Sequence, residues 1–263
     1  PYFIGNRIGV FALLRAIRYY TEGEYTIEEI DTLTGPLVGR PKSATFRTAD
    51  LVGLDVLLHV AQNLSEKVED DERREAFQVP DVLRRLVEDG RLGEKTKAGF
   101  YKKEDGEIKS LDPETSEYTS AEEQTLDTLD SIRNAGGLSA RLSALYDDDG
   151  RAGRFFRETT LELLAYSANR IGEITDNPAD VDRDMRWGFG WEQGPFETWD
   201  ALGMDRVRTG LADHDLEAPT WVQHMTGAGT SFYRTKKGKR TVYLPAEEGY
   251  EPDPRPRDEM RLA

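Results

Sequence analysis

The chain has 263 residues, of which 37% are hydrophobic, so it is long enough for one large or two ordinary domains and too apolar to remain disordered. Its 50 acidic and 35 basic residues give a net charge of -15, which excludes most binding to nucleic acid and to anionic membranes. It has no cysteine, which excludes disulfides, thiolate metal sites and a cysteine nucleophile, and we expect a cytoplasmic protein.

The first half of the chain has the pattern of a helical bundle that ends in a hairpin. Apolar residues recur at helical spacing over residues 3–20, which predicts a long helix that is apolar on most sides. Thr26 and Glu29 have the spacing of a capping box and predict the start of a short helix. A Gly- and Pro-rich loop and two further helices follow, and the turn residues 112–115 predict a closing β-hairpin.

The second half shows the same order of elements. Residues 120–134 are polar and predict a helix that joins the two halves. A second long apolar helix is expected over about residues 154–174, and Asn177 before a proline predicts the start of a short one. Lys237-Gly238 predicts the turn of a final hairpin.

Individual residues also recur in the same order in the two halves. Phe46, Thr48, Asp50, Gly53 and Asp55 reappear 150 positions later as Phe196, Thr198, Asp200, Gly203 and Asp205. Other matches are Ile30-Asp31 and Gly39 with Val181-Asp182 and Gly190, and Phe100-Tyr101 and Tyr118 with Phe232-Tyr233 and Tyr250. Three registers in one order indicate an internal duplication.

The expected fold is therefore all-α, with two tandem helical-bundle domains that each end in a small β-hairpin. The predicted boundaries are residues 1–119 and 151–250 for the two domains, 120–150 for the connecting segment and 251–263 for a linker tail.

Motifs for known chemistry are mostly absent. The sequence has no G-x-G-x-x-G, P-loop, H-E-x-x-H or G-x-S-x-G pattern. His59, His214 and His224 are scattered, so no metal site is expected. Trp187, Trp191 and Trp199 are expected in the core. Gly39-Arg40-Pro41-Lys42 could contact a phosphate, but a helix-entry loop with a solvated lysine is favoured, and residues 95–101 are expected to be a turn into the hairpin.

Asn6 is the polar residue that stands out on the first helix. It lies one turn from the helix start among Phe3, Ile4 and Ile8. A carboxamide in apolar surroundings must satisfy its donors and acceptor, either within the core or toward a ligand. The residues alone leave both alternatives open.

Together, these segments resemble the C-terminal domain of 3-hydroxyacyl-CoA dehydrogenases over nearly the whole chain. The matching motifs are Phe3-Ile4-x-Asn6-Arg7, Glu29-Ile30-Asp31, Asp50-Leu51-Val52-Gly53-Leu54-Asp55, Lys95-Thr96-x-x-Gly99-Phe100-Tyr101, Trp187-Gly188-Phe189-Gly190 and Gly194-Pro195-Phe196-Glu197. The first half departs from the family pattern at Gly5, where we expect no consequence, and at Ser43-Ala44-Thr45, where Gly-Pro is usual.

The resemblance implies a fold like the C-terminal part of 6-phosphogluconate dehydrogenase and an NAD-dependent oxidation of (3S)-3-hydroxyacyl-CoA in fatty acid β-oxidation. It implies that Asn6 is catalytic and helps to hold a histidine and the substrate oxygen. The second half has Arg157 or Glu158 at the matching place, so the role is assigned to Asn6 alone. The implied partners are an acyl-CoA substrate and a Rossmann domain outside this chain, without which we expect no NAD binding and no activity.

Three broader expectations remain. Tandem copies resemble the large multifunctional members of the family, in which an enoyl-CoA hydratase domain can follow, and the chain, which begins at Pro1 without Met, is interpreted as a fragment. Ten Lys against twenty-five Arg on an acidic chain resembles proteins of halophiles, with an ordinary acidic cytosolic protein as the alternative. The rival function is a non-catalytic helical scaffold or dimerisation module, and in either case the two copies are expected to pair within the chain.

Overall fold

Two long antiparallel helices lie at the centre of the molecule in the computed structural model, which describes residues 3–120, 126, 128–227 and 231–253. They are α1 (Ile4–Thr21) and α8 (Arg151–Asn169), and each begins one half of the chain. Their side chains meet in opposite chain order, so the helices run antiparallel. The pairs that show this are Arg7 with Tyr166, Phe11 with Tyr166, Arg15 with Glu162, and Tyr19 with Glu158.

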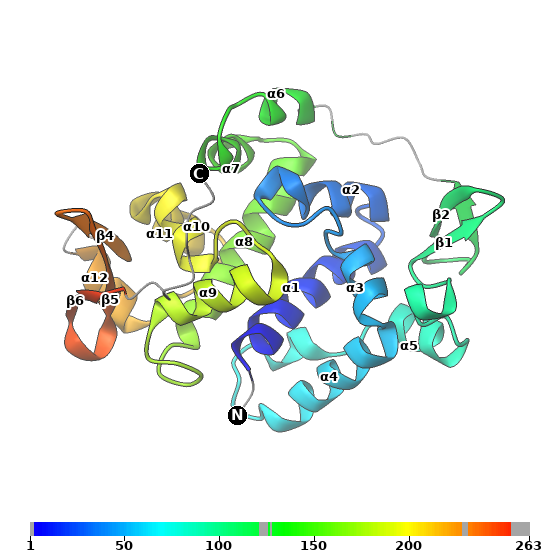
Figure 1. Ribbon diagram of the computed structural model, residues 1–263, viewed down its shortest axis with the longest axis horizontal. Coiled ribbons are helices and arrows are strands. Elements are labelled where there is room, and N and C mark those ends of the chain that lie inside the picture. Colours follow the sequence, from blue (N-terminus) through cyan, green and yellow to red (C-terminus); the bar gives the residue numbers. More distant parts are fainter. Residues whose placement is uncertain (1–2, 121–125, 127, 228–230, 254–263) are drawn as a thin grey trace.

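The other elements surround this pair and follow the same order in both halves (Figure 1). The first half contains α2 (Ile27–Leu33), α3 (Phe46–Val52), α4 (Leu54–Lys67), α5 (Asp81–Glu88) and the antiparallel sheet β1 (Tyr101–Glu104), β2 (Glu107–Leu111) and β3 (Tyr118–Ser120). The second contains α9 (Pro178–Phe189), α10 (Pro195–Leu202), α11 (Met204–Asp213), α12 (Thr220–Gly227) and the antiparallel sheet β4 (Tyr233–Lys236), β5 (Lys239–Leu244) and β6 (Gly249–Pro252). Short 3₁₀ turns lie at Pro36–Val38, Arg74–Phe77, Glu94–Thr96 and Pro245–Glu247.

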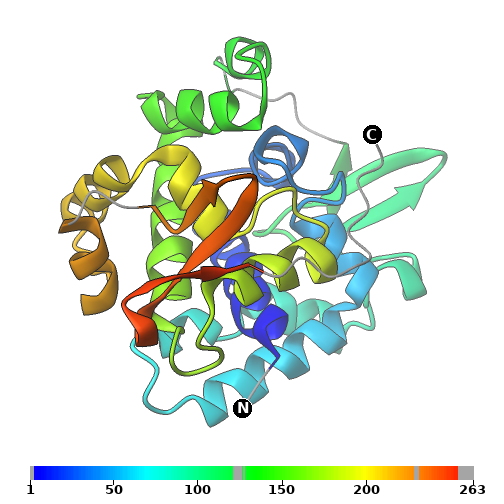
Figure 2. The ribbon, with the colours of Figure 1, turned by 60° about the vertical axis from the view of Figure 1, so that its left-hand side comes forward.

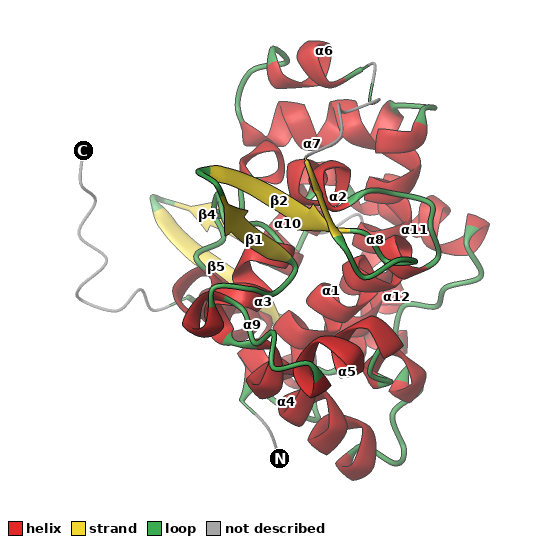
Figure 3. Cartoon of the chain, turned by 90° about the vertical axis from the view of Figure 1, so that its right-hand side faces the viewer, coloured by secondary structure: helices red, strands yellow, loops and turns green. Residues whose placement is uncertain are grey.

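The connecting segment lies across one edge of the molecule as α6 (Leu129–Arg133) and α7 (Leu138–Asp147), and the two sheets lie at opposite ends (Figure 1). Helices dominate, with strands confined to the two small sheets, so the expected fold class is confirmed (Figure 3). The domain boundaries stay a prediction. Within the predicted joining helix 120–134, residues 121–125 and 127 lie outside the described residues, Ser120 belongs to β3, and α6 (Leu129–Arg133) is helical. Helix α7 was not expected.

Several local predictions are confirmed. Helix α1 begins and ends within one residue of the expected range. Thr26 and Glu29 form the capping box of α2, and the Asn177 side chain accepts a hydrogen bond from the amide of Ala179 at the start of α9. The turn at residues 237–238 joins β4 to β5, and residues 95–101 lead into β1.

Other local predictions were wrong. Helix α8 ends at Asn169 rather than near residue 174, because a tight turn follows with Gly172 at φ +89°, outside helical geometry. The predicted turn at residues 112–115 is confirmed, because these residues join the antiparallel strands β2 and β3, but the hairpin between β1 and β2, which turns at Asp105 and Gly106, was missed. Both sheets have a third strand that the sequence did not indicate.

The buried apolar residues of both halves form one continuous core. Trp199 and Trp191 belong to it as expected, but Trp187 is 59% exposed and that prediction was wrong. Residue 187 falls on the outer face of α9, opposite the buried Val181 and Met185. None of the helices in the described part of the chain is long and apolar enough to cross a membrane.

Candidate functional site

The residues that recur in the sequence form hydrogen bonds that hold the helices and the first strand of each half together. We call this set of contacts the frame of that half. In the first half, the Asp50 carboxylate accepts hydrogen bonds from the backbone amides of Phe100 and Tyr101, each at 2.9 Å. The Tyr101 hydroxyl donates to Asp31 at 2.8 Å, and Asp31 also accepts from the amides of Thr45 and Phe46. The half-buried carboxylate of Asp31 and the buried carboxylate of Asp50 thus tie the start of α3 and the end of α3 to the residues at the beginning of β1.

The second half repeats these contacts with the matching residues. The Asp200 carboxylate accepts from the amides of Phe232 (2.8 Å) and Tyr233 (2.9 Å). The Tyr233 hydroxyl donates to Asp182 at 2.6 Å, and Asp182 accepts from the amide of Phe196 at 2.9 Å. The same donors and acceptors in both halves support the predicted duplication.

Burial raises the pKa of these carboxyl groups, although the amide hydrogen bonds act in the opposite direction. The pKa is raised to about 6 for Asp31, Asp50 and Asp200. The pKa of Asp182 is also raised, by burial and by the nearby charge of Glu197. Because all their described partners belong to the frame of their own half, we assign these groups to the fold and not to chemistry.

Asn6 lies in the first turn of α1 and is exposed. Within the described residues its carboxamide has no hydrogen-bond partner. The structure therefore excludes the core alternative and leaves the amide available to a ligand or to another domain. Arg157 and Glu158, the residues at the matching place in α8, are engaged within the fold: Arg157 donates to the carbonyl of Tyr146, and Glu158 accepts from Tyr19.

Exposed large apolar side chains lie at both ends of this part of the molecule. Phe3 is 85% exposed directly before α1 and three positions before Asn6. Leu51, Val52 and Val56, at the end of α3 and the beginning of α4, are also exposed. The start of α1 lies beside the C-terminal end of α4 in both Figure 1 and Figure 2, so these three residues lie away from Asn6. Phe3 is thus the exposed large apolar side chain at the start of α1, where contact with another body would cover it.

At the start of α1, a buried ionic cluster joins the two halves. The guanidinium of Arg7 is fully buried; it donates to the Tyr166 hydroxyl at 2.6 Å and pairs with Asp71 and, at 2.9 Å, with Glu173. The Asp71 carboxylate also accepts from Tyr166 and from Arg170, each at 2.8 Å. Burial alone would lower the pKa of Arg7, but its bonds to Tyr166 and Asp71 outweigh this and raise it.

Helix α9 of the second half packs closely on the start of α1. The amide of Gly5 donates to the carboxylate of Asp184. A Cβ at Gly5 would lie 2.9 Å from that carboxylate, and a Cβ at Gly9 would lie 2.0 Å from the ring of Phe189. We expected no consequence from the departure from the family pattern at Gly5. That prediction was wrong, because the absence of a side chain at Gly5 allows α9 to approach α1.

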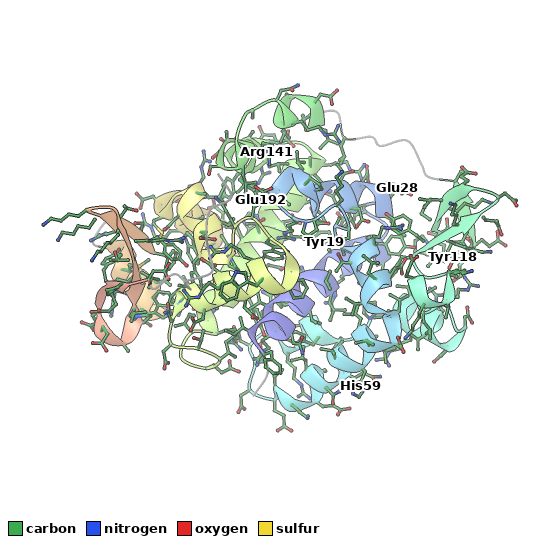
Figure 4. The ribbon with its side chains drawn as sticks, in the orientation of Figure 1. Tyr19, Glu28, His59, Tyr118, Arg141 and Glu192 are labelled. Atoms are coloured by element: carbon green, nitrogen blue, oxygen red, sulfur yellow. The ribbon has the colours of Figure 1, made fainter. Side chains whose placement is uncertain are left out.

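A cavity formed by described residues of α2, α7 and the loop after α9 lies elsewhere. It has a volume of about 820 Å³ and lies between α2, α7 and the loop after α9, where Glu28, Arg141 and Glu192 line it (Figure 4). Its charged lining residues are of mixed sign: Lys42, Arg47, Arg133 and Arg141 against Glu28, Asp31 and Glu192. A cavity lined by charges of both signs indicates no particular ligand. We therefore place the candidate site at the exposed carboxamide of Asn6 and not in this cavity.

The structure also locates the other residues that the sequence analysis singled out, which are those of the Arg40 loop and the three histidines. Lys42 is exposed, as expected for a solvated loop residue, while the Arg40 guanidinium lies 4.0 Å from the ring centre of Trp191. His59 is exposed on α4 (Figure 4), His214 lies at the end of α11, and His224 lies on α12. The described residues contain no group of His, Asp and Glu side chains that could hold a metal ion.

Comparison of the sequence with known proteins finds a matching family and several similar proteins. Residues 3–103 match the family described as "3-hydroxyacyl-CoA dehydrogenase, C-terminal domain". A "Probable 3-hydroxyacyl-CoA dehydrogenase" of Bacillus subtilis is 42% identical over 92% of this chain and 31% of its own length. A "Putative fatty acid oxidation complex trifunctional enzyme" of Rickettsia felis is 26% identical over 82% of this chain and 29% of its own length.

A solved structure shares the fold. The crystal structure of 3-hydroxybutyryl-CoA dehydrogenase from Escherichia coli K12 superposes with a TM-score of 0.57 at 20% identity and covers 84% of this chain and 59% of that one. The chain spans about a third of the length of the curated relatives it matches.

Proposed function

We propose that this chain, whose residues 3–103 belong to the family of 3-hydroxyacyl-CoA dehydrogenase C-terminal domains, is the substrate-side part of an NAD-dependent (3S)-3-hydroxyacyl-CoA dehydrogenase of fatty acid β-oxidation. The observation that carries the proposal is the exposed carboxamide of Asn6 in the first turn of α1, close in the chain to the exposed apolar side chain of Phe3.

Asn6 is suited to a polar role in such a reaction. Its carboxamide donates two hydrogen bonds and accepts others, so it can hold a substrate oxygen with one end and a catalytic residue of another domain with the other end. It does not titrate, so its contribution does not depend on pH. A preorganised donor of this kind stabilises the negative charge that develops on an oxygen as its proton leaves.

The start of α1 is suited to contact with a docked domain. Phe3 exposes an apolar side chain that water solvates poorly, and contact with a nucleotide-binding domain would bury it close to the polar group of Asn6. The acyl-CoA substrate would then lie between the start of α1 and that domain.

The described residues do not fit NAD. A pyrophosphate is commonly bound where a parallel strand leads through a glycine-rich loop into a helix. Both sheets in the described part of the chain are antiparallel, and the sequence has no G-x-G-x-x-G pattern. We therefore assign the nicotinamide to a domain outside this chain.

In this proposal the second half takes the place of a second subunit. Helix α9 packs on α1 and helix α2 packs on α8, so the contacts between the halves are reciprocal, as in a twofold dimer. A relative named as a trifunctional enzyme supports the idea that further enzymes, such as an enoyl-CoA hydratase domain, belong to the same polypeptide.

The test uses the longer polypeptide that carries this chain, with Asn6→Ala and the matched control Asn134→Ala. Asn134 is exposed at the end of α6, away from the start of α1 (Figure 1). We expect Asn6→Ala to lower kcat for hydroxyacyl-CoA oxidation by about 10²–10³. Because Asn6 is exposed, the melting temperature should change no more than in the control.

Normal turnover in folded Asn6→Ala protein would show that the residue has no catalytic role. Absence of dehydrogenase activity in the unmodified longer polypeptide would favour the rival function, a helical scaffold or dimerisation module.

A further inference from the structure

The start of α1 lacks a cap of its own. The residue before the helix, Phe3, has no side chain that can accept a hydrogen bond, and the first turn contains no acidic residue. The first amides of a helix have no partner within the helix, and together they carry a partial positive charge. A helix start of this kind frays unless another part of the protein supplies an acceptor.

The second half supplies that acceptor. Asp184, on α9, accepts a hydrogen bond from the amide of Gly5 and places a carboxylate at the positive end of α1. The approach depends on the two glycines of α1, because a Cβ at Gly9 would overlap the Phe189 ring of the same helix α9. Asp184 therefore caps α1 from 179 positions away in the sequence.

The second half also fixes the residue on the other side of Asn6. Arg7 is held by the Tyr166 hydroxyl of α8 and by Glu173. Gly5 and Arg7 are thus both bound by the second half, while Asn6 between them is exposed. The direction in which the carboxamide points is set by its two chain neighbours, whose partners Asp184, Tyr166 and Glu173 belong to the second half.

We propose that the second half positions Asn6 for catalysis and that Asp184 is the positioning residue at the helix start. This inference rests on the role of Asn6 in the proposed function. Asp184 does not contact the substrate; it acts by holding the first turn in one conformation. A displacement of about 1 Å in a positioned catalytic group can cost about 10² in rate, so a frayed first turn would lower kcat more than substrate affinity.

The structural arm of the test uses hydrogen exchange on the chain itself. We compare Asp184→Ala, Asp184→Asn and the control Asp176→Ala, whose carboxylate is exposed before α9. In Asp184→Ala, exchange of the amides of residues 5–7 should rise roughly five- to tenfold, as expected for a lost helix cap. Asp184→Asn keeps an acceptor oxygen and should restore much of the protection. Unchanged exchange in Asp184→Ala would overturn the inference, whatever the enzyme does.

The catalytic arm measures kcat and KM in the longer polypeptide with a double-mutant cycle. Asp184→Ala should lower kcat about tenfold with little change in KM, and Asp184→Asn should recover part of the loss. In an Asn6→Ala background, Asp184→Ala should cost nothing further, because there is no carboxamide left to position. An equal loss of kcat in both backgrounds would show a general structural effect and refute the positioning role.

The two proposals fail in different ways. If Asn6→Ala leaves kcat unchanged, the proposed function is wrong and the positioning role falls with it, even where the exchange result stands. If Asn6→Ala lowers kcat and Asp184→Ala does not, the proposed function stands and the inference is wrong.

Discussion

Phe11 of α1 and Tyr166 of α8 stack face to face, with ring centroids 4.1 Å apart and an angle of 4° between the ring planes. Both rings are fully buried. The hydroxyl at the edge of the Tyr166 ring contacts Arg7 and Asp71, so this one side chain contributes to both the apolar core and the ionic cluster between the halves. Removing the Tyr166 side chain should therefore lower the stability of the whole chain and not of one half.

Replacing Tyr166 with Phe separates the two contributions. The ring stack remains, but Arg7 and Asp71 each lose a buried hydrogen-bond partner, which should lower the free energy of unfolding by about 1–3 kcal/mol. The control is Tyr243→Phe, because the Tyr243 hydroxyl has no hydrogen-bond partner in the described residues and its ring also stacks, on Trp221. Urea denaturation measures both variants, and equal stability changes would contradict the expected role of the cluster.

The carboxyl groups of Asp50, which is buried, and Asp200, which is half-buried, should make stability depend on pH. Burial raises the pKa of each to about 6, against about 4 in an unfolded chain. The folded state therefore binds more protons between these values, so the contribution of each group is fully present below about pH 4 and is lost as pH rises through about 6.

The measurement compares the free energy of unfolding of the unmodified chain with that of Asp50→Asn from pH 4 to 7. The advantage of the unmodified chain should shrink over this range by at most roughly 2–3 kcal/mol. Asp200→Asn should give a similar curve, because Asp200 accepts the matching pair of amides. Asp176→Asn, which removes an exposed carboxyl group, provides the control. An advantage that grows with pH would show that the amide hydrogen bonds outweigh burial.

The net charge of -15 predicts a response to salt. If the acidic surface reflects adaptation to high salt, the melting temperature should climb as KCl rises toward 1 M, because screening relieves repulsion between surface carboxylates. Circular dichroism at increasing KCl concentration checks this. A flat or falling curve would support the alternative of an ordinary acidic protein and would leave the proposed enzyme unchanged.

The chain alone should not bind NAD appreciably. Both described sheets are antiparallel, and neither offers the strand, loop and helix start that receive a pyrophosphate. Calorimetric titration of NAD and NADH into the chain tests this directly. Micromolar affinity would place the nucleotide site within these residues and contradict the assignment to another domain.

The frame of each half could be predicted from the sequence because it is built from short, repeated signals. Asp50 and Asp200 recur at one offset, and each accepts the same pair of amides. The exposure of Asn6 could not be predicted. Helical periodicity gives the spacing of the apolar face, but whether position 6 falls inside or outside it depends on which neighbours cover the helix start.

The ionic cluster and the cap on α1 had no detectable sequence signal. Asp71 lies in a charged loop, and Arg170 and Asp184 carry charges of the kind that usually face solvent. Their burial or pairing follows only from the docking of one half on the other. Gly5 offered one indication, because a glycine near the start of a long helix lowers helix stability and is retained where another backbone or side chain must approach closely.

The distance along the chain between Arg7 and its partner Tyr166 has a consequence for biosynthesis. The two residues are 159 positions apart, so at about 5–20 residues per second the ribosome needs roughly 8–30 s to deliver Tyr166 after Arg7. During that interval the nascent α1 carries an apolar face and a guanidinium whose partners from α8 do not yet exist. A messenger cut after residue 119 would still encode the complete family match at 3–103, yet its product would keep this unpaired surface. Such a product should need a chaperone to stay in solution. A stable protein therefore requires translation of a longer segment than the residues that match the family.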